Sequence, residues 1–272
     1  MTQSNVAPAV AASTILLVRD LVRDLVRDSV QDLEVLMVVR HHQIDFASGA
    51  LVFPGGKVDA QDESAASHAR AGGGALSATQ VALRVAAIRE AYEESGILLA
   101  RHAGRGAELH AQDLTRLEPQ RRLVHDGKLP FAQLLQTEKL ELAIEELVHF
   151  AHWITPAMMP KRFDTHFYVA RVPPDQVAAH DGRESVDSLW ITPAAAIEDA
   201  KQKRRTVIFP TLRNLEKLAH FTSVAALLEA TRNQPVVPVL PWTEQRADGR
   251  YLCITAAAGY DVNEERMERE RE

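Results

Sequence analysis

The sequence contains a single cysteine, Cys253, among its 272 residues. One thiol excludes an intramolecular disulfide, and so low a cysteine content is typical of a reducing compartment. The neighbouring sequence offers this thiol no base that would activate it. We therefore expect Cys253 to be a packed structural side chain and not a nucleophile.

Long apolar runs are also missing. The sequence has no stretch of about 18 apolar residues, and its first twelve residues lack a basic region followed by an apolar run. The last two residues, Arg271 and Glu272, do not fit a peroxisomal targeting signal. These absences predict a cytoplasmic protein that does not associate with membranes.

There is no excess of basic residues either. Lys and Arg number 31 against 37 Asp and Glu, which gives a net charge of −6. Nonspecific binding to nucleic acid is therefore not expected, and a local site has to bind any phosphate group of a substrate. With 46% hydrophobic and 25% charged residues, the chain has the composition of a globular protein with a substantial core.

A strong helix signal covers residues 78–95. Ser77 and Gln80 fit the capping-box pattern, in which two side chains satisfy free N–H groups where a helix begins. Gly96 suits the left-handed residue that often ends a helix. The apolar positions that share one side of this helix are Val81, Val85, Ile88 and Tyr92. We expect this side to pack in a core.

Three glutamates lie on roughly the opposite side of the same helix. Glu90, Glu93 and Glu94 are spaced i, i+3 and i+4, so their carboxylates project within about one turn of one another. Clustered carboxylates repel one another unless a cation neutralises them, and hard cations such as Mg²⁺ prefer oxygen ligands. Because an acidic pair on a helix is usually just solvated surface, the metal hypothesis depends on the surrounding sequence.

Residues 53–59, F-P-G-G-K-V-D, supply that context. Together with the helix they resemble the Nudix hydrolase signature, G-x5-E-x7-R-E-U-x-E-E-x-G-U, in which U is aliphatic. The second half matches at Arg89, Glu90, Ala91, Glu93, Glu94, Gly96 and Ile97. The first half matches at Gly56, but Val81 occupies the helix position of the signature glutamate, and the two halves are 19 residues too far apart. Asp62 lies at the signature distance from Gly56, which leaves open whether it replaces that glutamate.

The remaining sequence resembles one Nudix branch, the peroxisomal coenzyme A diphosphatases, whose signature is also interrupted. The likeness lies in W-I-T-P at 153–156, in R-F-D-T-H-F at 162–167, and in a helical insertion at 108–149. The expected helices of that insertion are 113–126, 131–135 and 143–148. Residues 63–77, inside the signature, are expected to form a short helix and a flexible turn.

The resemblance implies an α/β fold, a Nudix-type α/β/α sandwich with a mixed central sheet, over residues 11–195. Strand-like runs at 11–19 and 33–40 flank a threefold Leu-Val-Arg-Asp repeat, interpreted as a lengthened hairpin connection. Residues 1–10 are interpreted as a flexible leader, and the loop at 41–49 is expected to border the substrate.

Residues 196–262 are expected to form a C-terminal extension that covers the substrate cleft or mediates a homodimer. Helices are expected at 194–203 and 211–233, and Asp248-Gly249 signals a hairpin. Residues 263–272 are interpreted as a charged, disordered tail.

The resemblance also implies roles for individual residues. Glu93 and Glu94, assisted by Glu90, are expected to bind Mg²⁺ or Mn²⁺. Arg89 is expected to pair with Glu93 and orient the cluster, so Arg89 and Glu90 are assigned as catalytic. The predicted metal ligands are thus Glu90, Glu93 and Glu94.

Other residues are expected to bind substrate or act as the base. Gly55 and Gly56 expose backbone N–H groups that suit a close approach of phosphate. Lys161 and Arg162 form a basic pair suited to a diphosphate. Glu184 is the first choice for a catalytic base in the loop before the strand near 190. The alternatives for the base are Asp187, Glu145 and Glu146.

The function implied is Mg²⁺-dependent hydrolysis of the diphosphate linkage between a nucleoside and another moiety. Branch resemblance favours coenzyme A or acyl-CoA, while ADP-ribose, a dinucleotide or a nucleotide sugar remains an alternative. A second class is a catalytically silent module that binds a nucleotide. The missing signature glutamate favours the silent module slightly, and the retained carboxylate triplet favours the enzyme.

Overall fold

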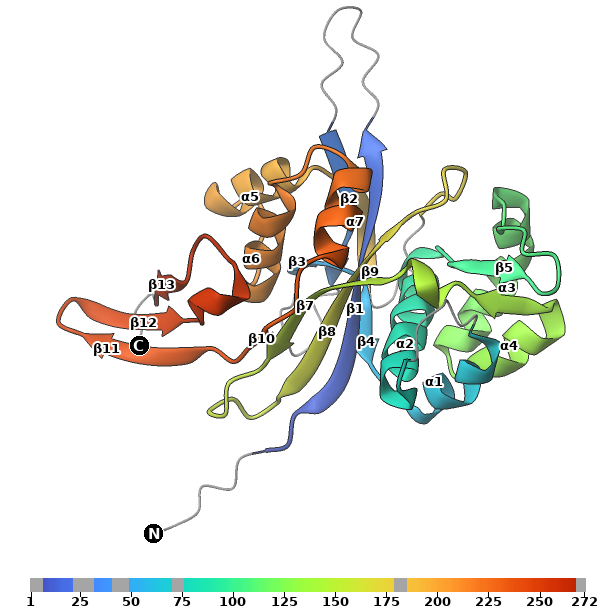
Figure 1. Ribbon diagram of the computed structural model, residues 1–272, viewed down its shortest axis with the longest axis horizontal. Helices are drawn as coiled ribbons and strands as arrows, with labels where there is room; N and C mark the ends of the chain where they lie inside the picture. Colours follow the sequence, from blue (N-terminus) through green and yellow to red (C-terminus); the bar gives the residue numbers. More distant parts are fainter. Residues whose placement is uncertain (1–6, 22–31, 41–48, 70–75, 179–184, 268–272) are drawn as a thin grey trace, which may run out of the picture.

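The computed structural model describes residues 7–21, 32–40, 49–69, 76–178 and 185–267. A mixed eight-stranded sheet lies between two groups of helices (Figure 1). Its strands are β1 (Val10–Leu21), β2 (Asp32–Arg40), β3 (Leu51–Val52), β4 (Gly55–Lys57), β7 (Val148–Ile154), β8 (Phe163–Arg171), β9 (Ser185–Ile191) and β10 (Pro238–Val239). The architecture confirms the expected α/β sandwich.

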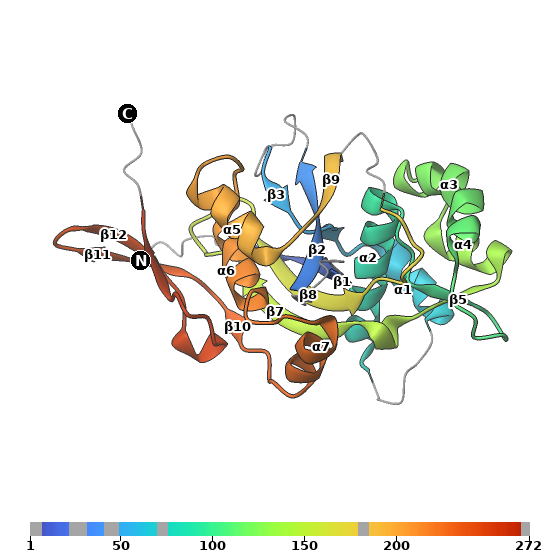
Figure 2. The same cartoon turned by 90° about the horizontal axis from the view of Figure 1, so that it is seen from above.

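Helices cover both faces of this sheet, as the two perpendicular views show (Figures 1 and 2). One group consists of α1 (Ala60–Ala65), α2 (Ala78–Ser95), α3 (Ala111–His125) and α4 (Phe131–Glu138). The other consists of α5 (Pro193–Lys201), α6 (Phe209–Leu218) and α7 (Val224–Arg232). Each group encloses its own hydrophobic cluster against the sheet.

Two small sheets complete the fold. The strands β5 (Ala100–His102) and β6 (Leu140–Leu142) pair beside the helical insertion. A three-stranded sheet of β11 (Trp242–Arg246), β12 (Gly249–Cys253) and β13 (Glu264–Arg266) projects beyond α5 and α6 (Figures 1 and 2). Asp248 lies in the turn between β11 and β12, and Gly249 begins β12, as the predicted Asp248-Gly249 hairpin signal requires.

Strand β1 organises the sheet because it is long enough to have different partners along its length. It runs parallel to β8, while its first half pairs antiparallel with β4 and its last four residues pair with β2. Ile15 and Leu17 pack on the α2 side, and Leu16 and Val18 pack on the α7 side. Burial on both faces explains the nearly continuous apolar run in this strand.

Three expectations about helices and ends are wrong. The helix expected at 143–148 is a single 3-10 turn, Ile144–Glu146, that leads into β7. The helix expected at 211–233 is two helices, because the chain breaks after Leu218 and Ser223 caps α7 by accepting from Ala226 N. The tail expected at 263–272 includes β13, which pairs with β12.

Some predictions fall on segments outside the described residues. They concern the second and third copies of the Leu-Val-Arg-Asp repeat, most of the loop at 41–49, the centre of the insert at 63–77, and Glu184. The first part of that insert contains the end of α1 and a 3-10 turn, Ala66–His68, as expected. Among the described residues, no helix has both the length and the apolar character to cross a membrane.

Candidate active site

Helix α2 begins and ends as its sequence predicts. Ser77 Oγ accepts from the backbone N–H of Gln80, and the Gln80 side chain accepts from the backbone N–H of Ser77 at 2.9 Å. Gly96 adopts a left-handed conformation with φ of 75° and donates its N–H to the carbonyl of Tyr92. Because local sequence sets both ends, the register of the three glutamates along the helix is set as well.

The carboxylate side of α2 is buried, although the sequence predicted only that it lies opposite the core stripe. Glu90, Glu93 and Glu94 are 9%, 8% and 6% exposed, and every residue from 85 to 95 is buried. Strand β4 and helix α1 both contact α2, as does α3 of the helical insertion. The carboxylates therefore lie between structural elements and not on an open helix face.

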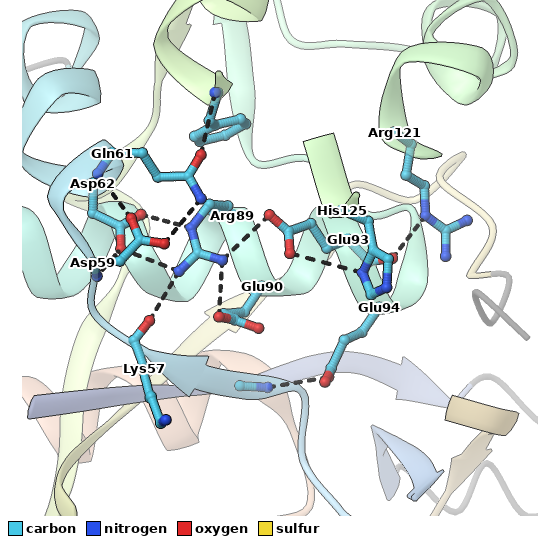
Figure 3. Close-up of polar contacts among 12 residues, drawn as sticks. Lys57, Asp59, Gln61, Asp62, Arg89, Glu90, Glu93, Glu94, Arg121 and His125 are labelled. Atoms are coloured by element: carbon cyan, nitrogen blue, oxygen red, sulfur yellow. Dashed lines mark hydrogen bonds and ion pairs between the residues drawn. The ribbon is translucent and has the colours of Figure 1, made fainter. Parts of the chain in front are cut away.

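Arg89 stands at the centre of the cluster (Figure 3). Its Nη1 donates to Glu90 Oε1 at 2.8 Å and to Glu93 Oε1 at 3.2 Å. Its Nη2 donates to the Lys57 carbonyl at 2.9 Å and to Asp62 Oδ2 at 3.1 Å, and its Nε donates to Asp62 Oδ1 at 2.7 Å. All five N–H donors of the guanidinium are thus used, which fixes its orientation and that of the acids it contacts.

Asp62 occupies the end of α1 that faces Arg89. Its side chain is fully buried, and it also accepts from the backbone N–H of Asp59, which in turn caps α1. The capping box on this six-residue helix therefore holds Asp62 in place for a two-pronged ion pair with Arg89. The two halves of the interrupted signature meet at this pair, across the inserted residues.

The two glycines of F-P-G-G lie so close to neighbouring atoms that a larger residue would not fit at either position. A Cβ on Gly56 would lie 2.4 Å from Glu90 Oε1, so a larger residue would displace that carboxylate. A Cβ on Gly55 would lie 2.6 Å from the carbonyl oxygen of Ser13. The Gly55 N–H donates to Glu94 Oε2 at 3.1 Å, which connects β4 to the end of α2.

The helical insertion contributes two further residues that the sequence did not suggest. Arg121 Nε donates to the Glu93 carbonyl at 3.0 Å, and His125 Nδ1 lies 3.9 Å from Glu93 Oε2. Tyr92 donates to the carbonyl of Leu117 at 2.8 Å, which anchors the middle of α3 on α2. The insertion therefore packs directly on the carboxylate helix and extends the site.

The ionisation of the cluster follows from its burial. Burial opposes the charge on Arg89, but the hydrogen bond with Asp62 and the charges of Glu90, Asp62 and Glu93 outweigh it and raise the pKa of Arg89. Burial also raises the pKa of Glu93, against the lowering effects of Arg89 and His125. Glu93 thus carries its charge at an energetic cost that a nearby cation would remove.

The donor set fits a hard divalent cation. The carboxylates of Asp62, Glu90 and Glu93 gather around one guanidinium, and the carboxylate of Glu94, which accepts from Gly55 N–H, is buried on the same helix as the other two glutamates. Buried negative charge in excess is costly, and a further cation would offset that cost. Their oxygens are the ligand type that Mg²⁺ and Mn²⁺ prefer. Arg89 uses both Asp62 oxygens, which leaves Glu90, Glu93 and Glu94 as the residues that would bind metal.

Other predicted residues are not brought to this cluster. Arg162 donates to the carbonyl of Thr155 at 3.0 Å and to that of Ala7 at 2.8 Å, in the loop before β8. Lys161 is exposed in the same loop, which the two views place at the end of the sheet away from α2 (Figures 1 and 2). A role of these two residues in substrate binding stays a prediction.

Glu184 lies outside the described residues, and the other candidates for the base lie on elements other than α1, α2 and β4. Asp187 is exposed on β9. Glu145 and Glu146 both pair with Arg101 beside the small sheet of β5 and β6, and not on a helix face. The base therefore stays a prediction on Glu184, with Asp187 second.

Fold and carboxylate cluster together define a Nudix domain. The NUDT19 Nudix domain model matches residues 66–218, more than half of the chain, and the chain belongs to this family. An acyl-coenzyme A diphosphatase NUDT19 from Gallus gallus is 31% identical over 275 residues, which cover 84% of this chain and 70% of that protein. A crystal structure of a NUDIX hydrolase from Alicyclobacillus acidocaldarius superposes with a TM-score of 0.69 at 25% identity, covering 84% of this chain and 99% of the other.

The acyl-coenzyme A diphosphatase NUDT19 from Xenopus laevis is 27% identical over 238 residues. That alignment covers 72% of this chain and 62% of the Xenopus protein. The chain therefore spans less than two thirds of the length of this relative.

Proposed function

We propose that the chain is a Nudix diphosphohydrolase that uses Mg²⁺ or Mn²⁺ to cleave the diphosphate linkage of coenzyme A or acyl-CoA. The observation that carries the proposal is the ion pair of Asp62 with Arg89, which completes the interrupted signature around Glu90, Glu93 and Glu94. The relatives whose names specify acyl-coenzyme A diphosphatases support the choice of substrate.

Each residue of the cluster has its own proposed role in the reaction. When bound, the metal ion would lower the pKa of a water molecule and neutralise charge on the phosphate oxygens. Arg89 holds Glu90 and Glu93 in fixed orientation, so little reorganisation is needed as charge develops. Gly55 keeps Glu94 in place and Gly56 leaves space beside Glu90 for its carboxylate. Glu184 is proposed as the base that accepts the proton of the attacking water.

A silent nucleotide-binding module is the weaker alternative. The sequence favoured this alternative because the signature glutamate is missing. In the structure the buried carboxylate of Asp62 contacts Arg89, so a carboxylate from the first half of the signature is present there. A module that only binds a nucleotide also has no need for three buried carboxylates on one helix, whose charge is costly without a cation.

Hydrolysis assays on the full chain test the proposal. CoA, acyl-CoA, ADP-ribose, NADH and a diadenosine compound are incubated with Mg²⁺ or Mn²⁺, and phosphate is measured after a coupled phosphatase. We expect turnover of CoA or acyl-CoA, and a loss of about 10³-fold in Glu93→Gln with Glu94→Gln. The control Glu63→Gln changes an exposed acid of α1 outside the cluster and should retain full activity.

Two results would contradict the proposal. Turnover of none of the five compounds, together with tight binding of one of them, would establish the silent module. Turnover that survives the double substitution would exclude the carboxylate cluster as the metal site.

A further inference from the structure

A second group of potential metal ligands lies on β7 and β8, outside the carboxylate cluster. His152, Asp164 and His166 each offer a ligand atom, and the three atoms lie within 4.8 Å of one another. The pairing of β7 with β8 creates the group, because His152 is opposite His166 and Ile154 is opposite Asp164. Among the described residues, this is the group of histidines and acids whose ligand atoms all lie that close together, whereas the carboxylates around Arg89 would have to move closer to share one ion.

The group lies on the same face of the sheet as α2, and β8 is two strand spacings from β4, whose Gly56 approaches Glu90. His166 is paired with Ser13 of β1, and Ser13 is paired with Gly56 of β4. Two strand spacings of about 4.8 Å put the Cα atoms of His166 and Gly56 roughly 10 Å apart. The two groups of ligands are therefore separate sites on one surface of the sheet.

We propose that His152, Asp164 and His166 bind a borderline first-row cation of the Zn²⁺ type. Two imidazoles and one carboxylate suit Zn²⁺, Co²⁺ or Ni²⁺, whereas Mg²⁺ prefers the all-oxygen set around Arg89. The Asp164 side chain is 40% exposed, so the group is accessible to an ion from solvent. The site joins two strands and is distinct from the proposed catalytic metal site.

His149 supports this assignment as a positioning residue. Its Nε2 lies 3.1 Å from His166 Nδ1, which satisfies that nitrogen of His166 and leaves Nε2 of His166 for the ion. Ligand histidines in proteins usually have their second nitrogen bonded in this way.

An ion pair without metal explains only part of the arrangement. His152 and Asp164 are close enough to form such a pair. His166 stacks on His152 with ring centroids 4.0 Å apart but has no part in that ion pair. A shared cation would bind all three side chains through one atom each.

Zinc binding by the metal-stripped full chain tests the proposal. The protein is dialysed against Zn²⁺ in the presence of millimolar Mg²⁺, which occupies the carboxylate cluster, and bound zinc is measured by mass spectrometry. We expect one Zn²⁺ per chain, a loss of affinity of about 100-fold or more in His152→Asn and in His166→Asn, and a loss of about 10-fold in His149→Gln.

Two control variants separate this site from other zinc ligands. His220→Gln changes a histidine that pairs with Asp261 elsewhere, so zinc binding should be unchanged. Glu93→Gln with Glu94→Gln should also retain the Zn²⁺ ion, whatever its effect on hydrolysis. The proposal is overturned if His152→Asn and His166→Asn bind zinc as the wild type does, or if the glutamate substitutions abolish binding.

A measurement on the unmodified protein covers the case in which a variant fails to fold. With ¹⁵N-labelled histidine, addition of Zn²⁺ should shift the imidazole resonances of two histidines by the amounts typical of coordination. Resonances that stay unchanged at one equivalent of Zn²⁺ would refute the site without any substitution.

Discussion

The two halves of the interrupted signature differ in how they are stabilised. The half on α1 consists of a six-residue helix whose capping box is formed by Asp59 and Asp62. The half on α2 is an 18-residue helix that is buried along its last three turns. The first half has to supply only one carboxylate, that of Asp62, so a short capped helix can hold it. The ion pair between Asp62 and Arg89 then fixes the position of α1 against α2. An insertion between the halves is tolerated because this contact, and not chain continuity, joins them.

The largest effect is expected from removing the group on which both halves depend. Arg89→Met leaves the carboxylates of Asp62, Glu90 and Glu93 without their guanidinium, which should lower the free energy of unfolding by about 3–5 kcal/mol. Urea denaturation measures the loss. The control Arg84→Met removes a half-buried arginine of the same helix, α2, whose guanidinium stacks on the Tyr168 ring. It should lower the free energy of unfolding by less than about 1.5 kcal/mol. Equal losses in the two variants would show that Arg89 does not join the halves.

A methyl group on Gly56 tests the contact of β4 with α2. The Cβ in Gly56→Ala would meet Glu90 Oε1 at 2.4 Å, and the displaced carboxylate should reduce kcat by about 10²-fold. Steady-state kinetics on the best substrate of the panel gives the value. Gly104→Ala introduces a Cβ with open space around it at a left-handed φ of 74°, so it controls for the general cost of strain. Comparable kcat values for the two variants would exclude a role for close packing at Glu90.

A double-mutant cycle measures the ion pair itself. Asp62→Asn should cost about 2–3 kcal/mol, because the two-pronged pair loses its charge. In the Arg89→Met background the same substitution should cost less, with a coupling of about 1–3 kcal/mol. Denaturation of the four proteins under one set of conditions gives the coupling. Additive effects would show that the halves are held together by other contacts.

The smallest effect is expected in how the free energy of unfolding of the metal-free protein depends on pH. Burial raises the pKa of Glu93 in the folded state, so the folded protein binds more protons than the unfolded chain above the ordinary pKa of a glutamate. The free energy of unfolding should therefore fall as pH rises from that value to the folded-state pKa. Denaturation in EDTA from pH 4 to 7 tests this slope, and Glu93→Gln should reduce it. A slope of the opposite sign would mean that the cluster stabilises the charged Glu93 without metal.

The sequence predicted the elements whose signals are local. Helix 78–95 is confirmed to the residue, because Ser77, Gln80 and Gly96 specify its ends through contacts within one turn. The hairpin at Asp248-Gly249 is confirmed for the same reason. The division of 211–233 into two helices was missed because its apolar spacing continues across the break, and the cap at Ser223 was not recognised.

For the candidate active site, sequence alone determined the triplet of glutamates and the glycines that approach it, since both follow from a spacing within one element or one turn. Only the tertiary structure decided that Asp62 completes the cluster and that the carboxylates are buried, because these depend on how α1, α3 and β4 pack against α2. The histidines of β7 and β8 show the same limit. The register of the two strands, with an irregularity between His149 and Ala151, brings His152 opposite His166, and no local spacing specifies that register.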